Sequence, residues 1–447
     1  MNNEKIKIGS EAVYDASKLG KGKMLVLGLQ HMFAMFGATV LVPVLTGLSV
    51  STTLLCAGLG TLLFHFITKR KIPAFLGSSF AFLAGYWAIA PNGEAELLPY
   101  ACFAVACSGI LYFVLAALIK IFGSKQVMRF FPPIVTGPII IAIGLNLSQS
   151  AIDNCANNWF IAIVAIAIIV VCNIWGKGMI RIVPILLGVI GSYVVAAAMG
   201  QVDFTPVAEA AWIGSPIEWN RTVFSLFPGA DASLLITAVV TIVPIALATM
   251  VEHIGDISAI SSTVGINYMK APGLHRTLVG DGLATSLAAL FGGPANTTYG
   301  ENTGVLTLTK VYDPKVIQIA AVVATLFSFC PKISALISCM PAATMGGVSL
   351  VLYGMISAVG VRNIVETKID FTENRNVLIA ALILVLSIGI NYSSLGAISF
   401  TIAGITISLS GLAVGSLVGI ILNAILPGHP YEYNEDKPDH TGVNFEV

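Results

Sequence analysis

Charged residues are scarce in this sequence. Asp, Glu, Lys and Arg make up only 10% of the 447 residues, whereas soluble domains contain about 25%. The acids and bases balance, so the formal net charge at pH 7 is zero. The low charge excludes an ordinary soluble protein, and the neutral balance gives no indication of a nucleic-acid or polyanionic partner.

Signatures of catalysis and of metal binding are also missing. The seven cysteines form no Cys-x-x-Cys pair and no Cys/His spacing of a metal site. The Gly-x-Ser-x-Gly, His-Glu-x-x-His and phosphate-loop patterns do not occur. An intramembrane aspartyl protease needs Gly-x-Gly-Asp, but the stretch before Asp281 reads Leu278-Val-Gly280. The sequence therefore predicts no enzyme, no cofactor and no metal.

Long apolar runs are what the sequence has in abundance. Hydrophobic residues make up 56% of the chain, and stretches long enough to cross a bilayer recur from end to end. They predict an all-α polytopic membrane protein with fourteen transmembrane segments. Their approximate limits are 24–46, 51–68, 74–90, 99–120, 131–148, 159–175, 182–199, 232–255, 276–292, 298–309, 315–337, 341–358, 377–391 and 410–426.

The distribution of basic residues fits this topology. With the N-terminus inside, all but two of the 23 lysines and arginines fall in segments expected on the cytoplasmic side, the exceptions being Arg221 and Lys332. Cytoplasmic loops of membrane proteins carry such an excess of positive charge. We therefore expect a multi-pass protein of the cell (inner) membrane with both termini in the cytoplasm.

The two halves of the chain resemble each other. Gln30-His31 in the first half matches Glu252-His253 in the second, and Ser79 and Glu301 each follow 49 positions later. Seven segments per half is an odd number, so the halves must have opposite orientations. A seven-plus-seven inverted repeat with interrupted segments in matching positions predicts a binding site at the repeat interface, near the middle of the membrane.

The most unusual stretch, Gly292–Lys310, is rich in Gly, Thr and Asn and carries Glu301. Acids at membrane depth are costly and usually mark a substrate or ion path. We expect a short extended piece followed by a half-helix here, in segment 10, and in segment 3 around Phe80. Free N–H groups at half-helix ends and the carboxylates of Glu252 and Glu301 would suit a ligand with both carbonyl acceptors and N–H donors.

These motifs resemble a known family. Glu301-Asn302-x-Gly304-x-x-x-x-Thr309-Lys310 is similar to the nucleobase–ascorbate transporter signature [QEP]-N-x-G-x-x-x-x-T-[RKG]. Glu252-His253-Ile-Gly255 and Thr297-Thr298-Tyr299-Gly300 resemble the uracil permeases of bacteria within that family. The resemblance covers about residues 20 to 427.

The resemblance implies a core domain and a gate domain that each combine two parts of the chain. The core comprises 24–122 (segments 1–4) and 232–338 (segments 8–11), the gate 123–231 (segments 5–7) and 339–427 (segments 12–14), and cytoplasmic tails occupy 1–23 and 428–447. It also implies import of uracil by proton symport, with an elevator-like movement of the core against the gate, and a homodimer. The implied substrate-binding residues are Glu252, Glu301, Phe80, Ala38, Tyr299 and Gly300; Asp256, Asp281, Asn302 and His31 would support the site or couple the proton.

Two residues depart from the pattern of the uracil permeases and leave alternatives for the substrate and the coupled ion open. Asp256 stands where uracil permeases often have histidine, and Asp281 resembles an acid of the purine carriers. A xanthine or uric-acid permease is therefore the main alternative, and sodium remains an alternative to the proton. An anion exchanger of the same fold is less favoured, because two ligand-facing carboxylates repel an anion.

Overall fold

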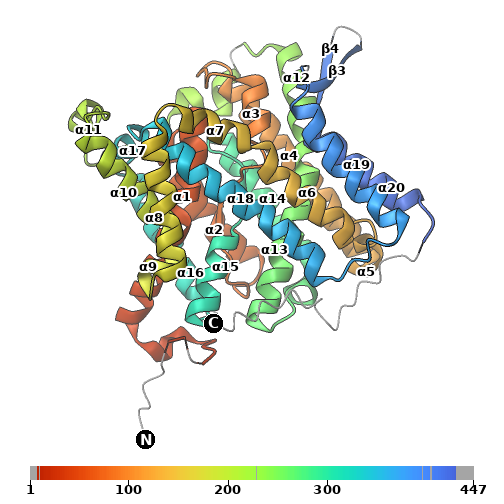
Figure 1. Ribbon diagram of the computed structural model, residues 1–447, viewed down its shortest axis with the longest axis horizontal. Helices are drawn as coiled ribbons and strands as arrows, with labels where there is room; N and C mark the ends of the chain where they lie inside the picture. Colours follow the sequence, from red (N-terminus) through yellow and green to blue (C-terminus); the bar gives the residue numbers. More distant parts are fainter. Residues whose placement is uncertain (1–7, 10, 228, 395, 403–404, 429–447) are drawn as a thin grey trace, which may run out of the picture.

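The computed structural model describes residues 8–9, 11–227, 229–394, 396–402 and 405–428. For Glu301, 401–402 and 405–408 it describes the backbone alone. The chain forms a bundle of helices with a few short strands (Figure 1).

The first half contains eleven α-helices and one strand. They are α1 (Lys21–Thr46), α2 (Val50–Ile67), β1 (Leu76–Ser78), α3 (Leu83–Ile89), α4 (Leu98–Phe122), α5 (Ser124–Met128), α6 (Pro133–Asn146), α7 (Ser148–Ala156), α8 (Trp159–Trp175), α9 (Met179–Ile182), α10 (Pro184–Ala198) and α11 (Thr205–Glu209).

The second half follows a similar order and adds a hairpin. Its elements are α12 (Ala232–Ile242), α13 (Ala246–Val264), α14 (Leu274–Leu290), β2 (Asn296–Thr298), α15 (Gly300–Thr309), α16 (Pro314–Ser328), α17 (Pro331–Ser338), α18 (Ala342–Glu366), α19 (Asn374–Asn391), β3 (Ala397–Ile402), β4 (Ile405–Ser410) and α20 (Gly411–Ile425). Short 3-10 turns lie at Ala16–Leu19, Trp219–Arg221, Val223–Leu226 and Val243–Ile245, and a π turn at Met269–Gly273.

Side-chain caps begin several of these helices. Ser49, Asn158, Asp231 and Ser410 each accept a hydrogen bond from a backbone N–H in the first turn of the helix that follows. Such caps satisfy N–H groups that have no partner within the helix. The polar residues between the apolar runs therefore fix where the helices begin.

Several helices have the length and composition of membrane spans. In the described part of the chain, seven are long and apolar enough to cross a membrane, or eight if the bent pair α16–α17 is one span. These counts join α6 with α7 and α12 with α13. Shorter apolar helices, α8, α10 and α20, lie within other expected segments. The protein is thus a mostly helical, multi-pass membrane protein.

The structure differs from the expected segments in several places, among them the twelfth, which was expected to end at 358 but continues as α18 to Glu366. The eleventh, expected as one span over 315–337, is broken by 86° between α16 and α17, where Pro331 follows the extended residue Cys330. The eighth continues past 255 and ends at Val264, before Gly265 in the left-handed conformation. The β3–β4 hairpin was not expected, although Ala397-Ile-Ser-Phe-Thr-Ile402 alternates in polarity as a strand does.

Contacts between helices occur in matching pairs. A contact between two helices recurs between the helices at the corresponding positions of the other half. The contact of α8 with α10 corresponds to that of α19 with α20, and the contact of α18 with α8 to that of α6 with α19. The contact of α1 with α16 corresponds to that of α12 with α4. Helices α4 and α14 and helices α2 and α16 also pack together. Elements of one half are therefore in contact with elements of the other throughout the bundle.

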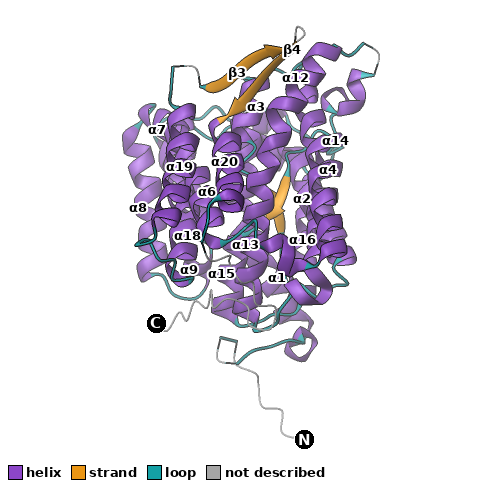
Figure 2. Cartoon of the chain, turned by 90° about the vertical axis from the view of Figure 1, so that its right-hand side faces the viewer, coloured by secondary structure: helices purple, strands orange, loops and turns teal. Residues whose placement is uncertain are grey.

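The strands β1 and β2 form an antiparallel pair within the bundle. Leu76 faces Thr298, Gly77 faces Thr297 and Ser78 faces Asn296, and all six residues are buried. The pairing extends beyond the strands, since Ser79 N–H donates to Ala295 O at 2.8 Å and Tyr299 N–H donates to Phe75 O at 3.0 Å. In Figure 2 this pair lies about halfway between the end of the bundle with β3 and β4 and the end with α15.

Hydroxyl groups of surrounding helices form hydrogen bonds with backbone groups at the outer edges of the strand pair. Leu76 N–H donates to Thr61 Oγ1 at 2.9 Å. Thr285 Oγ1 donates to Asn296 O at 2.8 Å. Ser78 Oγ donates in turn to Thr39 O at 2.9 Å. Irregular backbone at membrane depth is tolerated only when its polar groups find such partners in the protein.

We predict that Thr285→Val destabilises the protein by about 1–3 kcal/mol, because it leaves the buried Asn296 carbonyl without its hydroxyl donor. Thermal unfolding in detergent would measure the change. The matched control is Thr237→Val, since Thr237 is a half-buried threonine of α12 whose hydroxyl forms no hydrogen bond with another element in the described part of the chain. Equal stability of the two variants would contradict the prediction.

Candidate functional site

The expected site residues gather around the paired strands. Helix α13, which carries Glu252 and Asp256, contacts both β2 and α15. Helix α15 begins at Gly300, two residues after β2 ends. Helix α1, which carries Ala38 and His31, contacts β1 and α15. The tertiary structure therefore brings three helices and both strands together at one place.

One face of α13 presents both acids. Glu252 and Asp256 are partly exposed, as are Gly255, Ala259 and Thr263 further along the helix. These positions recur at helical spacing, so they share one face. Asp256 Oδ2 accepts a hydrogen bond of 2.8 Å from Thr298 Oγ1. This bond joins the acidic face of α13 to β2, two residues ahead of Gly300.

Helix α15 presents an open, glycine-lined face. Gly300, Gly304 and Leu308 are exposed at four-residue spacing, and no atom beyond the local backbone lies within 4 Å of where a Cβ would stand on either glycine. Gly300 is the first residue of the helix, so its N–H has no partner within the helix. Backbone donors with a positive helix end are therefore accessible on this face.

The aromatic residues of the site are packed. Phe80, Tyr299 and Ala38 are buried. Tyr299 Oη donates to Ser78 O at 2.9 Å, and its ring lies over Gly77, where an added Cβ would stand 2.4 Å from Tyr299 Cζ. Only glycine fits below this ring. Ser79 Oγ, beside Phe80, is buried and has no hydrogen-bond partner among the described residues, so a ligand could supply one.

Tyr353 of α18 is a site neighbour that the sequence analysis missed. Its ring lies edge-on to Phe80, with 5.6 Å between ring centroids and 75° between planes, and it is buried. The only signal in the sequence is a polar aromatic residue within an apolar segment, next to Gly354. Tyr353 contacts the site from a helix that the sequence assigns to the other domain.

Two buried polar pairs hold the surrounding helices together. Asn302 Nδ2 donates to His31 O at 3.1 Å and lies 3.1 Å from His31 Nδ1, which ties α15 to α1. His253 Nδ1 lies 3.2 Å from Asp281 Oδ2, with both side chains fully buried, and ties α13 to α14. Asp281 is thus in contact with the residue next to Glu252. In the described part of the chain, no group of three or more His, Cys, Asp or Glu side chains is placed to hold a metal ion.

Glu301 is located by its backbone alone. It is the second residue of α15, directly after Gly300, and its side chain lies outside the described part of the structure. The backbone places it at the open end of the half-helix. The approach of its carboxylate to that of Glu252 stays a prediction.

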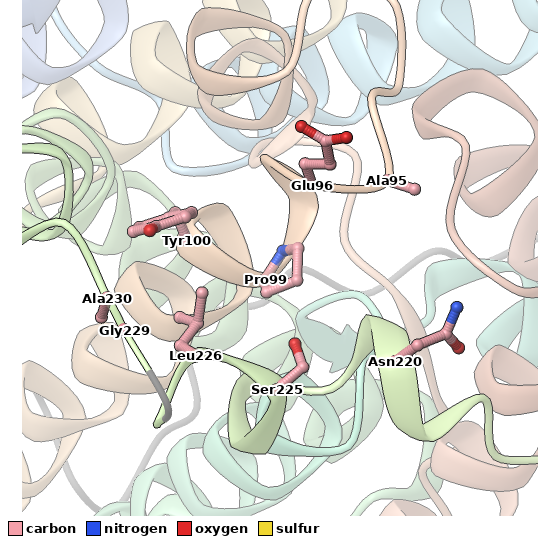
Figure 3. A pocket seen from close by; sticks show the side chains of 9 residues that line it. All are labelled: Ala95, Glu96, Pro99, Tyr100, Asn220, Ser225, Leu226, Gly229 and Ala230. Atoms are coloured by element: carbon pink, nitrogen blue, oxygen red, sulfur yellow. The ribbon is translucent and has the colours of Figure 1, made fainter.

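A pocket of about 280 Å³ lies elsewhere, between the start of α4 and the turns that precede α12 (Figure 3). Its lining includes Glu96, Pro99 and Tyr100 on one side and Asn220, Ser225 and Leu226 on the other. None of the expected site residues lines it. We therefore assign it no part in the site around the strands.

The sequence is similar to curated transporters over almost its full length. A sequence model of a family described as "Permease family" matches residues 22–396. The chain is 42% identical over 434 residues to a uracil permease of Bacillus caldolyticus, covering 94% of this chain and 96% of that protein. It is 40% identical over 425 residues to a uracil permease of Bacillus subtilis, covering 92% and 94%.

Solved structures share the fold at low sequence identity. The transmembrane domain of a cyanobacterial bicarbonate transporter, BicA, matches with a TM-score of 0.57 and 12% identity, over 92% of this chain and 99% of that chain. SLC26A9 matches with a TM-score of 0.65 and 12% identity, over 90% of this chain and 64% of that chain. At this identity the likeness concerns the fold alone.

We predict that Gly77→Ala displaces the Tyr299 ring and weakens ligand binding at least about tenfold, because an added methyl group cannot be accommodated in a packed interior without movement. A thermal-shift titration with ligand would measure the loss. Gly389→Ala in α19 is the matched control, since a Cβ there meets nothing within 4 Å. Unchanged affinity in Gly77→Ala would show that the ring position does not matter for binding.

Proposed function

The chain belongs to the permease family, and from that premise we propose that it is a secondary active transporter that imports uracil by proton symport. As a permease it is a transporter rather than an enzyme. The observation that carries the proposal is that Glu252 is partly exposed on a face of α13 that is bonded to β2 through Asp256 and Thr298, and that α13 also contacts α15. The identity to relatives named uracil permeases supports the choice of substrate.

The chemistry of uracil matches the groups on this surface. Its flat ring alternates N–H donors with carbonyl acceptors. We assign its N–H groups to the carboxylates of Glu252 and Glu301, which only accept when ionised. We assign a carbonyl to the N–H groups at Gly300, and an apolar ring face to Phe80. Ala38 and Tyr299 complete the pocket by packing below these groups.

We propose fourteen spans arranged as a seven-plus-seven inverted repeat. The matching helix contacts support it, because α8–α10 corresponds to α19–α20 and α1–α16 to α12–α4 when each segment of the first half is paired with the segment seven places later in the chain. In this arrangement the core domain is 24–122 with 232–338, and the gate domain is 123–231 with 339–427. Both termini are cytoplasmic, and two chains form a dimer in the cell membrane.

The contact between Phe80 and Tyr353 crosses the boundary between the proposed core and gate domains. Phe80 belongs to the proposed core and Tyr353 to the proposed gate, and their rings are in edge-on contact. An elevator-like movement of the core against the gate must break this contact. Because Phe80 also borders the ligand, arrival of uracil changes the same contact, and a ligand shifts a conformational equilibrium only through such differential contacts.

We assign the coupling proton to the acids around α13. Glu252 and Asp256 lie one turn apart on a poorly solvated face, where like charges favour sharing one proton. Asp281 lies beside His253 with no exposure to solvent, and we include this buried acid among the groups that carry the proton. Protonation permits uracil to bind, the core moves, and loss of the proton to the cytoplasm releases the ligand.

A xanthine or uric-acid permease is the second candidate. Asp281 favours it, because the resemblance places an acid there in purine carriers, and the structure makes this acid part of the support of α13. Anion exchange is disfavoured despite the fold shared with bicarbonate and SLC26 proteins, because Glu252 faces the site. Competition of labelled uracil by unlabelled xanthine and uric acid separates these candidates.

We predict saturable uracil uptake that Glu252→Ala and Glu301→Ala each reduce about 10- to 100-fold, since each loses a hydrogen bond to a charged group. Uptake of labelled uracil into cells, normalised to membrane-inserted protein, measures the effect. Glu96→Ala, in an exposed loop, is the matched control and retains uptake. Normal transport by intact Glu301→Ala protein would rule out the assigned site.

We further predict that uptake depends on a proton gradient and that Asp281→Asn removes this dependence while binding of uracil persists. Asparagine keeps the size of the side chain but cannot carry the proton. Proteoliposomes with imposed pH and sodium gradients provide the measurement, together with a protonophore. The assignment is contradicted if an imposed pH gradient still drives uracil accumulation by the variant. It is also contradicted if a sodium gradient alone drives uptake by the parent protein.

A further inference from the structure

The segment before α1 is part of the folded protein. We call residues 11–20, together with Gly9, the strap. The sequence predicted a polar tail at 1–23, but Val13, Ala16 and Leu19 are buried. They pack in a small apolar cluster with Leu27 of α1 and with Val311 and Val316, which flank the connection from α15 to α16. The strap therefore lies against the far end of the half-helix that carries Gly300.

Backbone hydrogen bonds join the strap to the end of α15. Gly9 N–H donates to Thr309 O at 2.9 Å, and Val13 N–H donates to Lys310 O at 2.8 Å. Tyr312 N–H returns a bond of 2.8 Å to Val13 O. The last carbonyls of a helix have no partner within it, and Lys310 ends α15 in the left-handed conformation. The strap supplies the donors that this helix end needs.

Asp313 fixes the same connection. Its Oδ2 accepts Ala16 N–H from the strap at 2.8 Å, and its Oδ1 accepts Lys315 N–H at the start of α16 at 2.9 Å. Asp313 is buried. One carboxylate therefore holds both the strap and the first turn of α16.

The strap also reaches the helix that carries the acids. Tyr14 Oη donates to Val264 O, the last residue of α13, at 2.8 Å. The same ring packs against Tyr312 with 5.5 Å between centroids. Tyr14 thus connects the end of α13 with the residues that follow α15.

We propose that the strap positions the substrate site, with Tyr14 as a positioning residue. It holds the ends of α13 and α15 together and so sets the spacing between Glu252 on one helix and the open N–H groups at Gly300 on the other. Helix α15 has ten residues, and at 1.5 Å per residue it is about 15 Å long. A displacement at its strap end is therefore carried to its ligand end. The identity of the ligand rests on the proposed function; the positioning does not.

The experiment compares Tyr14→Phe and Val13→Asp with Glu11→Gln in the full chain. Tyr14→Phe removes the bond to Val264 but keeps the ring, and Val13→Asp places a charge in the apolar cluster. Glu11 is an exposed strap residue that forms no hydrogen bond or ion pair with the residues that the structure describes, and it serves as the control. Val13→Ile is the conservative counterpart of Val13→Asp, because it keeps an apolar side chain in the cluster.

We expect Tyr14→Phe to raise the Kd and the uptake KM for uracil about threefold, the effect of one lost hydrogen bond, with Vmax per folded transporter retained. Val13→Asp should accelerate amide hydrogen exchange in residues 305–313 about tenfold, and Glu11→Gln and Val13→Ile should match the parent. The proposal would be overturned if Tyr14→Phe only reduced the number of folded molecules and left the Kd unchanged. It would also be overturned if Val13→Asp left amide hydrogen exchange in residues 305–313 unchanged.

The exchange measurement needs no ligand. A parent that bound no uracil would refute the proposed substrate, while exchange in 305–313 would still report whether the strap holds α15. The two failures are therefore distinguishable.

Discussion

The backbone around β1 and β2 leaves the helical path inside the bundle, and the site depends on how its polar groups are satisfied. A buried N–H or carbonyl without a partner is costly at membrane depth. The two strands solve this by pairing with each other, and hydroxyls such as Thr61 and Thr285 complete their outer edges. The break in the helices is thereby stable, and a new helix can begin where β2 ends.

In the proposed site, that new helix start supplies the backbone donors. Gly300 is exposed, and none of the described atoms beyond the local backbone lies within 4 Å of where its Cβ would stand. Asp256 is bonded to Thr298, two residues ahead of Gly300. The pairs His31–Asn302 and His253–Asp281 hold the supporting helices at their other faces. Donors, carboxylates and aromatic rings are then held by rigid elements, which lowers the cost of ordering them when a ligand binds.

Several of these features were accessible from the sequence because they are local. Apolar length indicated the membrane helices, and Glu301-Asn302-x-Gly304 indicated the family, which the match over residues 22–396 confirms. The break after Ser328, the β3–β4 hairpin and the contact of Tyr353 with Phe80 were not predicted. The break and the hairpin do have local signals, Pro331 and the alternation over Ala397–Ile402. The contact of Tyr353 with Phe80 joins residues far apart in the chain, for which hydrophobicity and spacing carry no signal.

The sequence by itself determined the class of protein and the family, since composition and motif are properties of neighbouring residues. Only the tertiary structure decided which strand pairs with which, that Asp281 faces His253, and that residues before α1 cap α15. The strap shows the reason most clearly. Its residues are polar enough to suggest a tail, and Val13 becomes buried through an apolar cluster with Val311 and Val316 and through backbone bonds to Lys310 and Tyr312.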